Sequence, residues 1–182
     1  MASFDVSQGY VKIREGGFQK NPKDAGNWTG GKVDVGTLVG TNFGISAPTL
    51  SGWLGRTATE ADMRALTYQT ALAIFKKNYW DALSLDQLAN QSTATLVYDG
   101  AVNQGTGAMK SILRDSLASL GVVTMTTDPK ILIQKANAVD PQKFFEAVKA
   151  KRKERYDRNT GHYAYSDWID RLNKVTFFFS KK

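Results

Sequence analysis

The chain has 182 residues, a formal net charge of +7, a single histidine and no cysteine. This length suits one domain, or one domain with a small second lobe, and it buries enough surface to fold without disulfides. The lack of cysteine excludes thiolate chemistry and the lone His162 excludes most zinc sites, so no metal or cofactor is expected. The positive charge favours a polyanionic partner such as nucleic acid, anionic lipid or a bacterial envelope.

The first predicted element is a short amphipathic helix near the N-terminus. Apolar residues from Phe4 to Ile13 lie at helical spacing, and Gly16 and Gly17 are typical of a helix end. Glu15 therefore falls in the last helical turn. The N-terminus lacks a basic stretch followed by an apolar one, and no run approaches the roughly 18 apolar residues of a membrane span. We expect neither a secretory signal nor an integral membrane segment.

Residues 18–56 form a glycine-rich segment that is held by apolar side chains. The apolar residues between Val33 and Val39 predict either a small twisted hairpin or an irregular loop. The other apolar anchors of this segment are Trp28, Phe43, Ile45 and Trp53. A long ordered loop inside a compact domain is commonly functional.

The rest of the chain predicts helices. Thr59 and Asp62 resemble a capping box at the start of a helix whose apolar stripe runs from Met63 to Phe75. Asp128-Pro129 and Asp140-Pro141 each resemble an N-cap followed by a proline that opens a helix. Further helices are expected over residues 93–103, 108–120 and about 165–175. The predicted fold is mainly α with a small β-hairpin or loop insert after the first helix.

Two carboxylates are candidates for acid and base chemistry. Glycoside hydrolysis usually uses two carboxyl groups that flank the scissile bond, one of them kept protonated. Glu15 follows an apolar helix, whose side chains we expect to raise its pKa, and precedes two glycines, which we expect to let a substrate approach closely. Asp24 lies in the returning loop and is the candidate base. The structural alternatives are a solvated surface glutamate and an aspartate that caps a turn.

Residues 15–46 resemble the signature of the glycoside hydrolase family 108 muramidases. That signature joins Glu-Gly-Gly-aromatic to Asn-Pro-x-Asp, followed by Gly, Thr and Gly-Ile. The matching positions here are Glu15, Gly16, Gly17, Phe18, Asn21, Pro22, Asp24, Gly26, Thr41, Gly44 and Ile45. The resemblance continues in order through residues 98–105, 147–152, 155–156 and 168–172.

The resemblance implies a lysozyme-like fold and cleavage of the bond between N-acetylmuramic acid and N-acetylglucosamine in peptidoglycan. It assigns the proton donor to Glu15, and either Thr29 or Thr41 holds the attacking water with Asp24. It also implies a catalytic lobe over residues 1–95 and a peptidoglycan-binding type of lobe over residues 96–182, packed as one unit. The expected biology is a monomeric bacteriophage endolysin, kept in the host cytoplasm until it reaches the periplasm and the wall.

Four further residues are candidates for substrate binding. Asn103 and Gln104 could hydrogen-bond N-acetyl groups of the sugar. Tyr98 either stacks on a sugar ring or packs in the core. Trp28 lies in the glycine-rich loop and is the tryptophan that we assign to the sugar.

Basic residues concentrate in residues 149–158. They form either a solvated helix face, with an ion pair between Glu154 and Arg158, or a surface that is attracted to anionic outer-membrane or membrane phosphates. Three other functions compete with hydrolysis: a lytic transglycosylase, a non-catalytic wall-binding phage module, and a nucleic-acid binder. The last ranks lowest because the basic residues lie in one late helix and no nucleic-acid motif appears.

Overall fold

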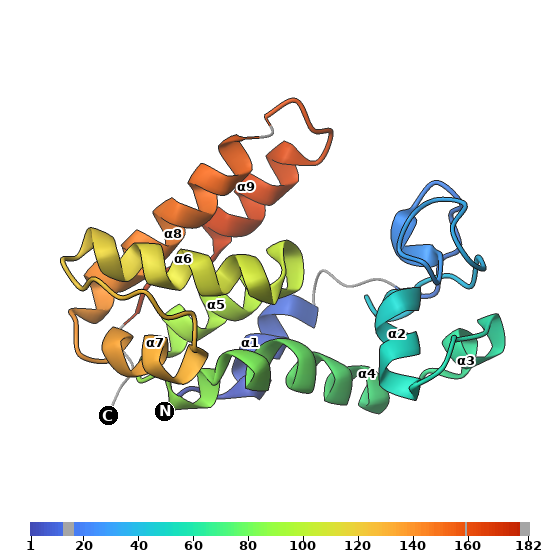
Figure 1. Ribbon diagram of the computed structural model, residues 1–182, viewed down its shortest axis with the longest axis horizontal. Coiled ribbons are helices and arrows are strands. Elements are labelled where there is room, and N and C mark those ends of the chain that lie inside the picture. The colour runs from blue at the N-terminus through green and yellow to red at the C-terminus, as the bar shows by residue number, and fades with distance from the viewer. Residues whose placement is uncertain (13–16, 159, 179–182) are drawn as a thin grey trace. The chain divides into compact units, whose positions relative to one another are not determined.

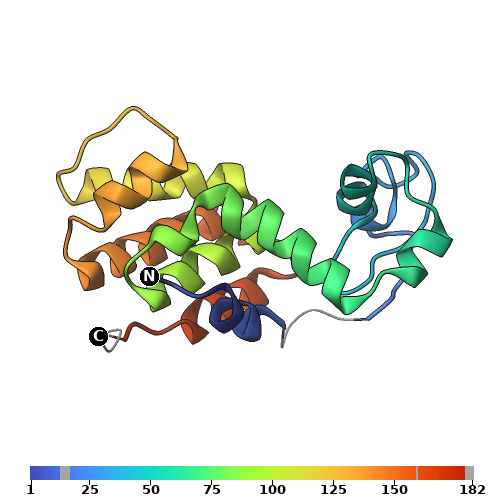
Figure 2. The same ribbon diagram turned by 90° about the horizontal axis from the view of Figure 1, so that it is seen from below.

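The computed structural model describes residues 1–12, 17–158 and 160–178. The chain separates into two compact units: unit 1 comprises Met1–Val11 and Lys77–Lys182, and unit 2 comprises Lys12–Lys76. The described residues form helices joined by loops (Figures 1 and 2), and no helix among them combines the length and apolar character needed to cross a bilayer. The expected lobes, residues 1–95 and 96–182, divide the chain by function, whereas these two units divide it by packing. The functional division stays a prediction.

Unit 1 is a helical bundle built around one central helix. Its helices are α1 (Phe4–Lys12), α5 (Gln91–Gln104), α6 (Thr106–Ser119), α7 (Pro129–Ala136), α8 (Pro141–Asp157) and α9 (Tyr165–Lys174). Every residue of α5 from Ser92 to Ala101 is buried, so α5 is covered on all sides. Helices α6 and α8 pack on α5 and on each other, while α7 contacts α6 and α9 contacts α8 (Figure 1).

A glycine allows α5 to approach its neighbours closely. A Cβ atom at Gly100 would lie 2.5 Å from Sδ of Met109 on α6 and 2.9 Å from Nε of Arg152 on α8. Those separations are too short for a methyl group, so only glycine fits between the two side chains. Gly100 therefore allows Arg152 to lie directly against α5.

The N-terminal helix α1 is held to unit 1 by partners that are distant in sequence. Phe4 meets Trp80 and Tyr98 edge-to-face, with ring centroids 5.8 and 5.7 Å apart. The hydroxyls of Ser7 and Thr95 are 2.9 Å apart in a buried hydrogen bond. The aromatic contacts bury apolar surface. The hydrogen bond between Ser7 and Thr95 gives each buried hydroxyl the partner that a buried polar group requires.

Unit 2 contains a 3-10 helix, Ala25–Asn27, and the helices α2 (Ala47–Leu54), α3 (Glu60–Ala65) and α4 (Tyr68–Phe75). The glycine-rich segment before α2 is the irregular loop rather than a regular hairpin. Within the described residues it has isolated antiparallel bridges, which pair Gln19 with Thr41, Trp28 with Leu38 and Asn42 with Ile45. A π-helical turn, Lys76–Trp80, follows α4 directly and contains the point where the chain returns to unit 1.

Three predicted helix starts are confirmed, and two features of the helices differ from the prediction. The capping box of Thr59 and Asp62 is confirmed, as are the N-caps at Asp128 and Asp140. The single helix expected from Thr59 to Phe75 was wrong, because the chain breaks after α3 and Thr67 caps a new helix, α4. Helix α2 was missed altogether.

Candidate active site

Asp24 lies in unit 2 with both carboxylate oxygens engaged. It caps the 3-10 helix Ala25–Asn27, and its Oδ1 accepts a hydrogen bond from the backbone N–H of Gly26 at 2.9 Å. Its Oδ2 accepts a hydrogen bond from Nε2 of Gln19, also at 2.9 Å. The residue is nevertheless exposed, so the carboxylate is fixed in orientation and still open to solvent.

Gln19 is itself fixed by a pair of reciprocal amide hydrogen bonds. Its Nε2 donates to Oδ1 of the buried Asn27 at 3.0 Å, and Nδ2 of Asn27 donates back to its Oε1 at 2.8 Å. Asn27 also donates to the backbone carbonyl of Asn21 at 2.8 Å, which anchors the pair to the loop. Sequence reasoning missed both amides, because their role depends on a pairing that no linear spacing reveals.

Asp24 and Thr41 lie on the same side of the loop at Gly26, whereas the hydroxyl of Thr29 is used elsewhere. An ideal Cβ position at Gly26 lies 3.3 Å from Oδ1 of Asp24 and 3.9 Å from Oγ1 of Thr41, so both oxygens border the same small space. Thr29 instead accepts a hydrogen bond at its Oγ1 from the backbone N–H of Thr37 at 2.9 Å. The hydroxyl of Thr29 therefore stabilises the turn between residues 29 and 37.

Backbone pairing holds Thr41 in this place. Gln19 and Thr41 exchange two backbone hydrogen bonds of 2.9 Å, one in each direction. The preceding residue, Gly40, has a φ of +95°, and a Cβ atom there would lie 2.7 Å from the carbonyl oxygen of Gln19. Both the dihedral angle and the close approach require glycine. The carboxylate orientation and the position of the hydroxyl thus depend on the same residue, Gln19.

Two further candidate site residues from the sequence, Glu15 and Trp28, fall in the range of unit 2. Glu15 lies outside the described residues. Trp28 is half-buried, and its indole N–H donates to the carbonyl oxygen of Pro22 at 2.9 Å. This bond ties the ring to the loop that carries Asp24. A role of Trp28 in sugar binding stays a prediction.

In unit 1, Asn103 and Gln104 line a cavity of about 450 Å³ at the C-terminal end of α5. The other lining residues are Arg155, Tyr156, Arg158 and Trp168. Oδ1 of Asn103 accepts a hydrogen bond of 2.6 Å from the hydroxyl of Tyr156, whose ring stacks on Trp168 with centroids 5.4 Å apart. The cavity therefore combines amide groups with an aromatic wall, a common composition in ligand pockets.

A buried ion network supports this wall. Asp99, which is fully buried, bonds Arg152 through Oδ2 at 2.9 Å and Arg171 through Oδ1 at 2.6 Å. Arg152 is also fully buried and donates to Oε1 of Gln104 at 3.0 Å and to the hydroxyl of Tyr156 at 3.1 Å. Burial raises the pKa of Tyr156, so its hydroxyl stays protonated and keeps donating a hydrogen bond to Asn103 in alkaline solution.

Tyr98 takes the core position among its two alternatives. It is fully buried, its ring packs edge-to-face on Trp80 at 5.8 Å, and its hydroxyl donates to Oε1 of Gln8. No part of this ring is open to a sugar in the structure. His162, in the loop before α9, stacks on Trp168 with ring centroids 4.5 Å apart.

Acidic side chains pair with half of the basic residues in segment 149–158. Arg152 is in the core, and Nζ of Lys149 donates to the carbonyl oxygen of Val175 at 3.0 Å. The pair expected between Glu154 and Arg158 was wrong, because Glu154 bonds Lys151 at 2.9 Å. Lys153 pairs with Asp157 at 2.8 Å. Among the described residues, Arg155, Arg158 and Lys149 have no acidic partner, and of these Lys149 is held by the carbonyl oxygen of Val175.

Across the described residues, no cluster of three or more histidine, cysteine, aspartate or glutamate side chains could hold a metal ion. The chemistry available at Asp24 and Thr41 is that of an oriented carboxylate and a neighbouring hydroxyl. Such a pair can hold and activate a water molecule.

The model of the family called glycosyl hydrolase 108 matches residues 9–105, more than half of the chain, and this range contains Asp24 and Thr41.

The chain belongs to glycosyl hydrolase family 108. It is therefore a glycoside hydrolase that acts on peptidoglycan. Among solved structures, SagA of Brucella abortus superposes with a TM-score of 0.71 over 94% of this chain and 90% of that chain, at 24% sequence identity. This likeness confirms the mainly α, lysozyme-like fold class of the family 108 enzyme. No curated protein matched the sequence.

Proposed function

We propose that this family 108 enzyme is a muramidase, which hydrolyses the β-1,4 bond between N-acetylmuramic acid and N-acetylglucosamine. The observation that carries the proposal is the Asp24 carboxylate, oriented by Gln19 and Gly26 beside the hydroxyl of Thr41. An oriented carboxylate next to a hydroxyl suits the activation of water. It has no evident use in a reaction that proceeds without water.

The proposed mechanism is a single displacement. Protonated Glu15 donates its proton to the glycosidic oxygen as the bond to the leaving sugar breaks and an oxocarbenium-like state forms. Asp24 removes a proton from a water molecule that Thr41 helps to orient, and this water attacks the anomeric carbon from the opposite face. The product is a reducing sugar of inverted configuration, for which the two carboxyl groups stand roughly 6.5–9.5 Å apart.

The test compares wild type with Glu15→Gln and Asp24→Asn on purified peptidoglycan, with turbidity loss as the readout and thermal unfolding as the control for folding. We expect wild-type lysis and a loss of at least about 100-fold in each variant. Product analysis should show reducing ends, and anomer-resolved NMR should show inversion. Anhydro products would identify a lytic transglycosylase instead. Sedimentation with walls without any lysis would identify a binding module.

We also propose that the biological role is host-cell lysis by a bacteriophage endolysin that is held in the host cytoplasm until it is released to the wall. The support is the net charge of +7, which favours an anionic envelope. Expression in a host, with and without permeabilisation of the inner membrane, tests this role. Lysis should require both the permeabilised membrane and Glu15. Lysis of intact cells by the Glu15→Gln variant would contradict the proposal.

A further inference from the structure

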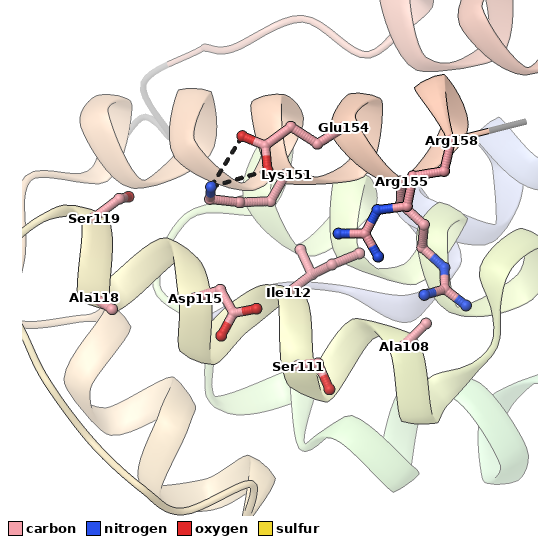
Figure 3. A pocket seen from close by; sticks show the side chains of 10 residues that line it. All are labelled: Ala108, Ser111, Ile112, Asp115, Ala118, Ser119, Lys151, Glu154, Arg155 and Arg158. Carbon is pink, nitrogen blue, oxygen red and sulfur yellow. Dashed lines mark hydrogen bonds and ion pairs between the residues drawn. The ribbon is translucent and has the colours of Figure 1, made fainter. Parts of the chain in front are cut away.

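Two arginines near the C-terminal end of α8 lie between two hollows of unit 1. One hollow is the cavity of about 450 Å³ that Asn103 and Gln104 line. The other, of about 550 Å³, lies between α6 and α8 (Figure 3). Arg155 and Arg158 line both. Each hollow has the size of a small-ligand site, and a ligand that spans both would contact both guanidinium groups.

The side chains differ in how they are used. In Figure 3 the guanidinium groups of Arg155 and Arg158 extend across the hollow towards α6, whereas Lys151 turns back to Glu154. Asp115, on the α6 side, accepts from Arg114 at 2.9 Å. Both acidic residues that line this hollow thus already have a basic partner. Arg155 and Arg158 lie three residues apart on one helix face, where two like charges repel unless an anion neutralises them.

We propose that Arg155 and Arg158 bind carboxylate groups of the peptide stems that peptidoglycan carries. This inference rests on the proposed function, because it names the part of the same substrate that unit 1 recognises. A guanidinium group offers a planar fork of donors that matches a carboxylate with two parallel hydrogen bonds. The amides of Asn103 and Gln104 in the adjoining cavity can pair with the peptide groups between such carboxylates.

The hollows favour a peptide over a membrane surface. Attraction to anionic lipid gains only about 1 kcal/mol for each basic residue near the surface, so it needs a large cluster of free charges. Three cations within residues 149–158 have no acidic partner among the described residues, and one of them, Lys149, donates to the carbonyl oxygen of Val175. The other two, Arg155 and Arg158, line the hollows. Two cations set in recesses suit a small, doubly charged ligand better than a flat charged sheet.

The experiment measures binding by the full-length Glu15→Gln protein, so that hydrolysis does not remove the ligand. The test variant adds Arg155→Gln and Arg158→Gln. The matched control adds Lys130→Gln and Lys153→Gln, which removes the same charge from exposed positions that line neither hollow. The probes are intact peptidoglycan, glycan strands stripped of stems by an amidase, a soluble stem peptide, and vesicles of phosphatidylglycerol.

We expect the arginine variant to bind the stem peptide and intact peptidoglycan at least about tenfold more weakly than the control, which corresponds to about 1.4 kcal/mol. Binding to stripped glycan should not change. Equal binding of peptide by the two variants, or no binding by either, would overturn the proposal. A loss confined to stripped glycan or to vesicles would also overturn it, in favour of a sugar subsite or a membrane contact.

The proposed function can fail separately from this inference. Wild type that does not lyse peptidoglycan would contradict the muramidase proposal. Binding of the soluble stem peptide needs no glycosidic bond, so its dependence on Arg155 and Arg158 is measured independently of lysis.

Discussion

Nε2 of Gln19 donates a hydrogen bond of 2.9 Å to Oδ2 of Asp24, the side of the carboxylate that the loop backbone does not hold. Gln19 was not among the candidate residues of the sequence. The same Nε2 also donates to the buried amide oxygen of Asn27, so the orientation of the proposed base depends on a buried residue of the loop.

Gln19→Met should lower kcat roughly 10- to 100-fold, because a misoriented base loses alignment with the reacting atoms. KM should change little, since Gln19 acts through Asp24. Steady-state kinetics on a soluble muropeptide check the split. A change in KM alone would contradict a positioning role.

Gln19→Glu should shift the acidic limb of the pH profile of kcat to higher pH. A second carboxylate beside Asp24 disfavours its ionised form and raises its pKa. The base is then deprotonated only at higher pH, so activity at low pH falls first. A limb that stays in place while kcat falls at every pH would mean that the substitution acts by distortion.

Thr41→Val should lower kcat roughly 10- to 100-fold with thermal stability nearly unchanged, because it removes one hydroxyl beside Asp24. Thr29→Val is the matched control. It should keep activity and lose stability by about 1 kcal/mol, since the backbone N–H of Thr37 loses its acceptor. Kinetics and chemical unfolding of the two variants separate the roles. The reverse pattern would assign the water to Thr29.

Asp99→Asn should destabilise the protein by about 3–5 kcal/mol, because it leaves the buried Arg152 without its carboxylate partner. Asp115→Asn, at a partly exposed pair on α6, should cost less than about 1 kcal/mol. Urea unfolding measures both. Similar losses for the two variants would show that the buried pair is no more important than the exposed one.

The pair of Arg56 and Asp62 predicts a pH-dependent contribution to stability. Two hydrogen bonds from Arg56, at 2.7 and 2.8 Å, hold the pKa of Asp62 well below its usual range, with further help from Thr59. Because the folded pKa is depressed, the contribution is full above the unfolded value of about 3.9 and is lost as the pH falls towards the folded value.

Asp62→Asn should therefore be less stable than wild type at pH 7, and the difference should shrink between pH 4 and pH 2. Urea unfolding at these three pH values measures the gap. A gap that stays constant would mean that the capping geometry, and not the charge, carries the stabilisation.

The sequence predicted those elements whose signals are local. Asp128 and Asp140 cap helices because each carboxylate accepts a backbone N–H of the first turn, and the proline that follows suits the first helical position. This chemistry needs no tertiary partner. Helix α2 carried a similar signal, with Ser46 before Ala47-Pro48, but it was hidden in a segment dominated by glycine. The break between α3 and α4 was missed because the apolar stripe continues across it.

The candidate site was predictable in its residues and not in its partners. Asp24 and Thr41 follow from a motif, whereas Gln19 and Asn27 follow from a pairing of amides in space. The burial of Arg152 could not be foreseen from a basic run, because the room for it is made by Gly100, which lies 52 residues earlier.

During synthesis on the ribosome, α1 emerges long before its partner in α9. Tyr10 donates to the carbonyl oxygen of Arg171, which is 161 residues later. At roughly 5–20 residues per second, this acceptor emerges on the order of ten seconds after the donor. Residues 12–76 have all their own elements long before that moment. We expect the middle of the chain to fold first during synthesis. Helix α1 can then pack on Trp80, Thr95 and Tyr98, and its bond from Tyr10 to α9 forms last.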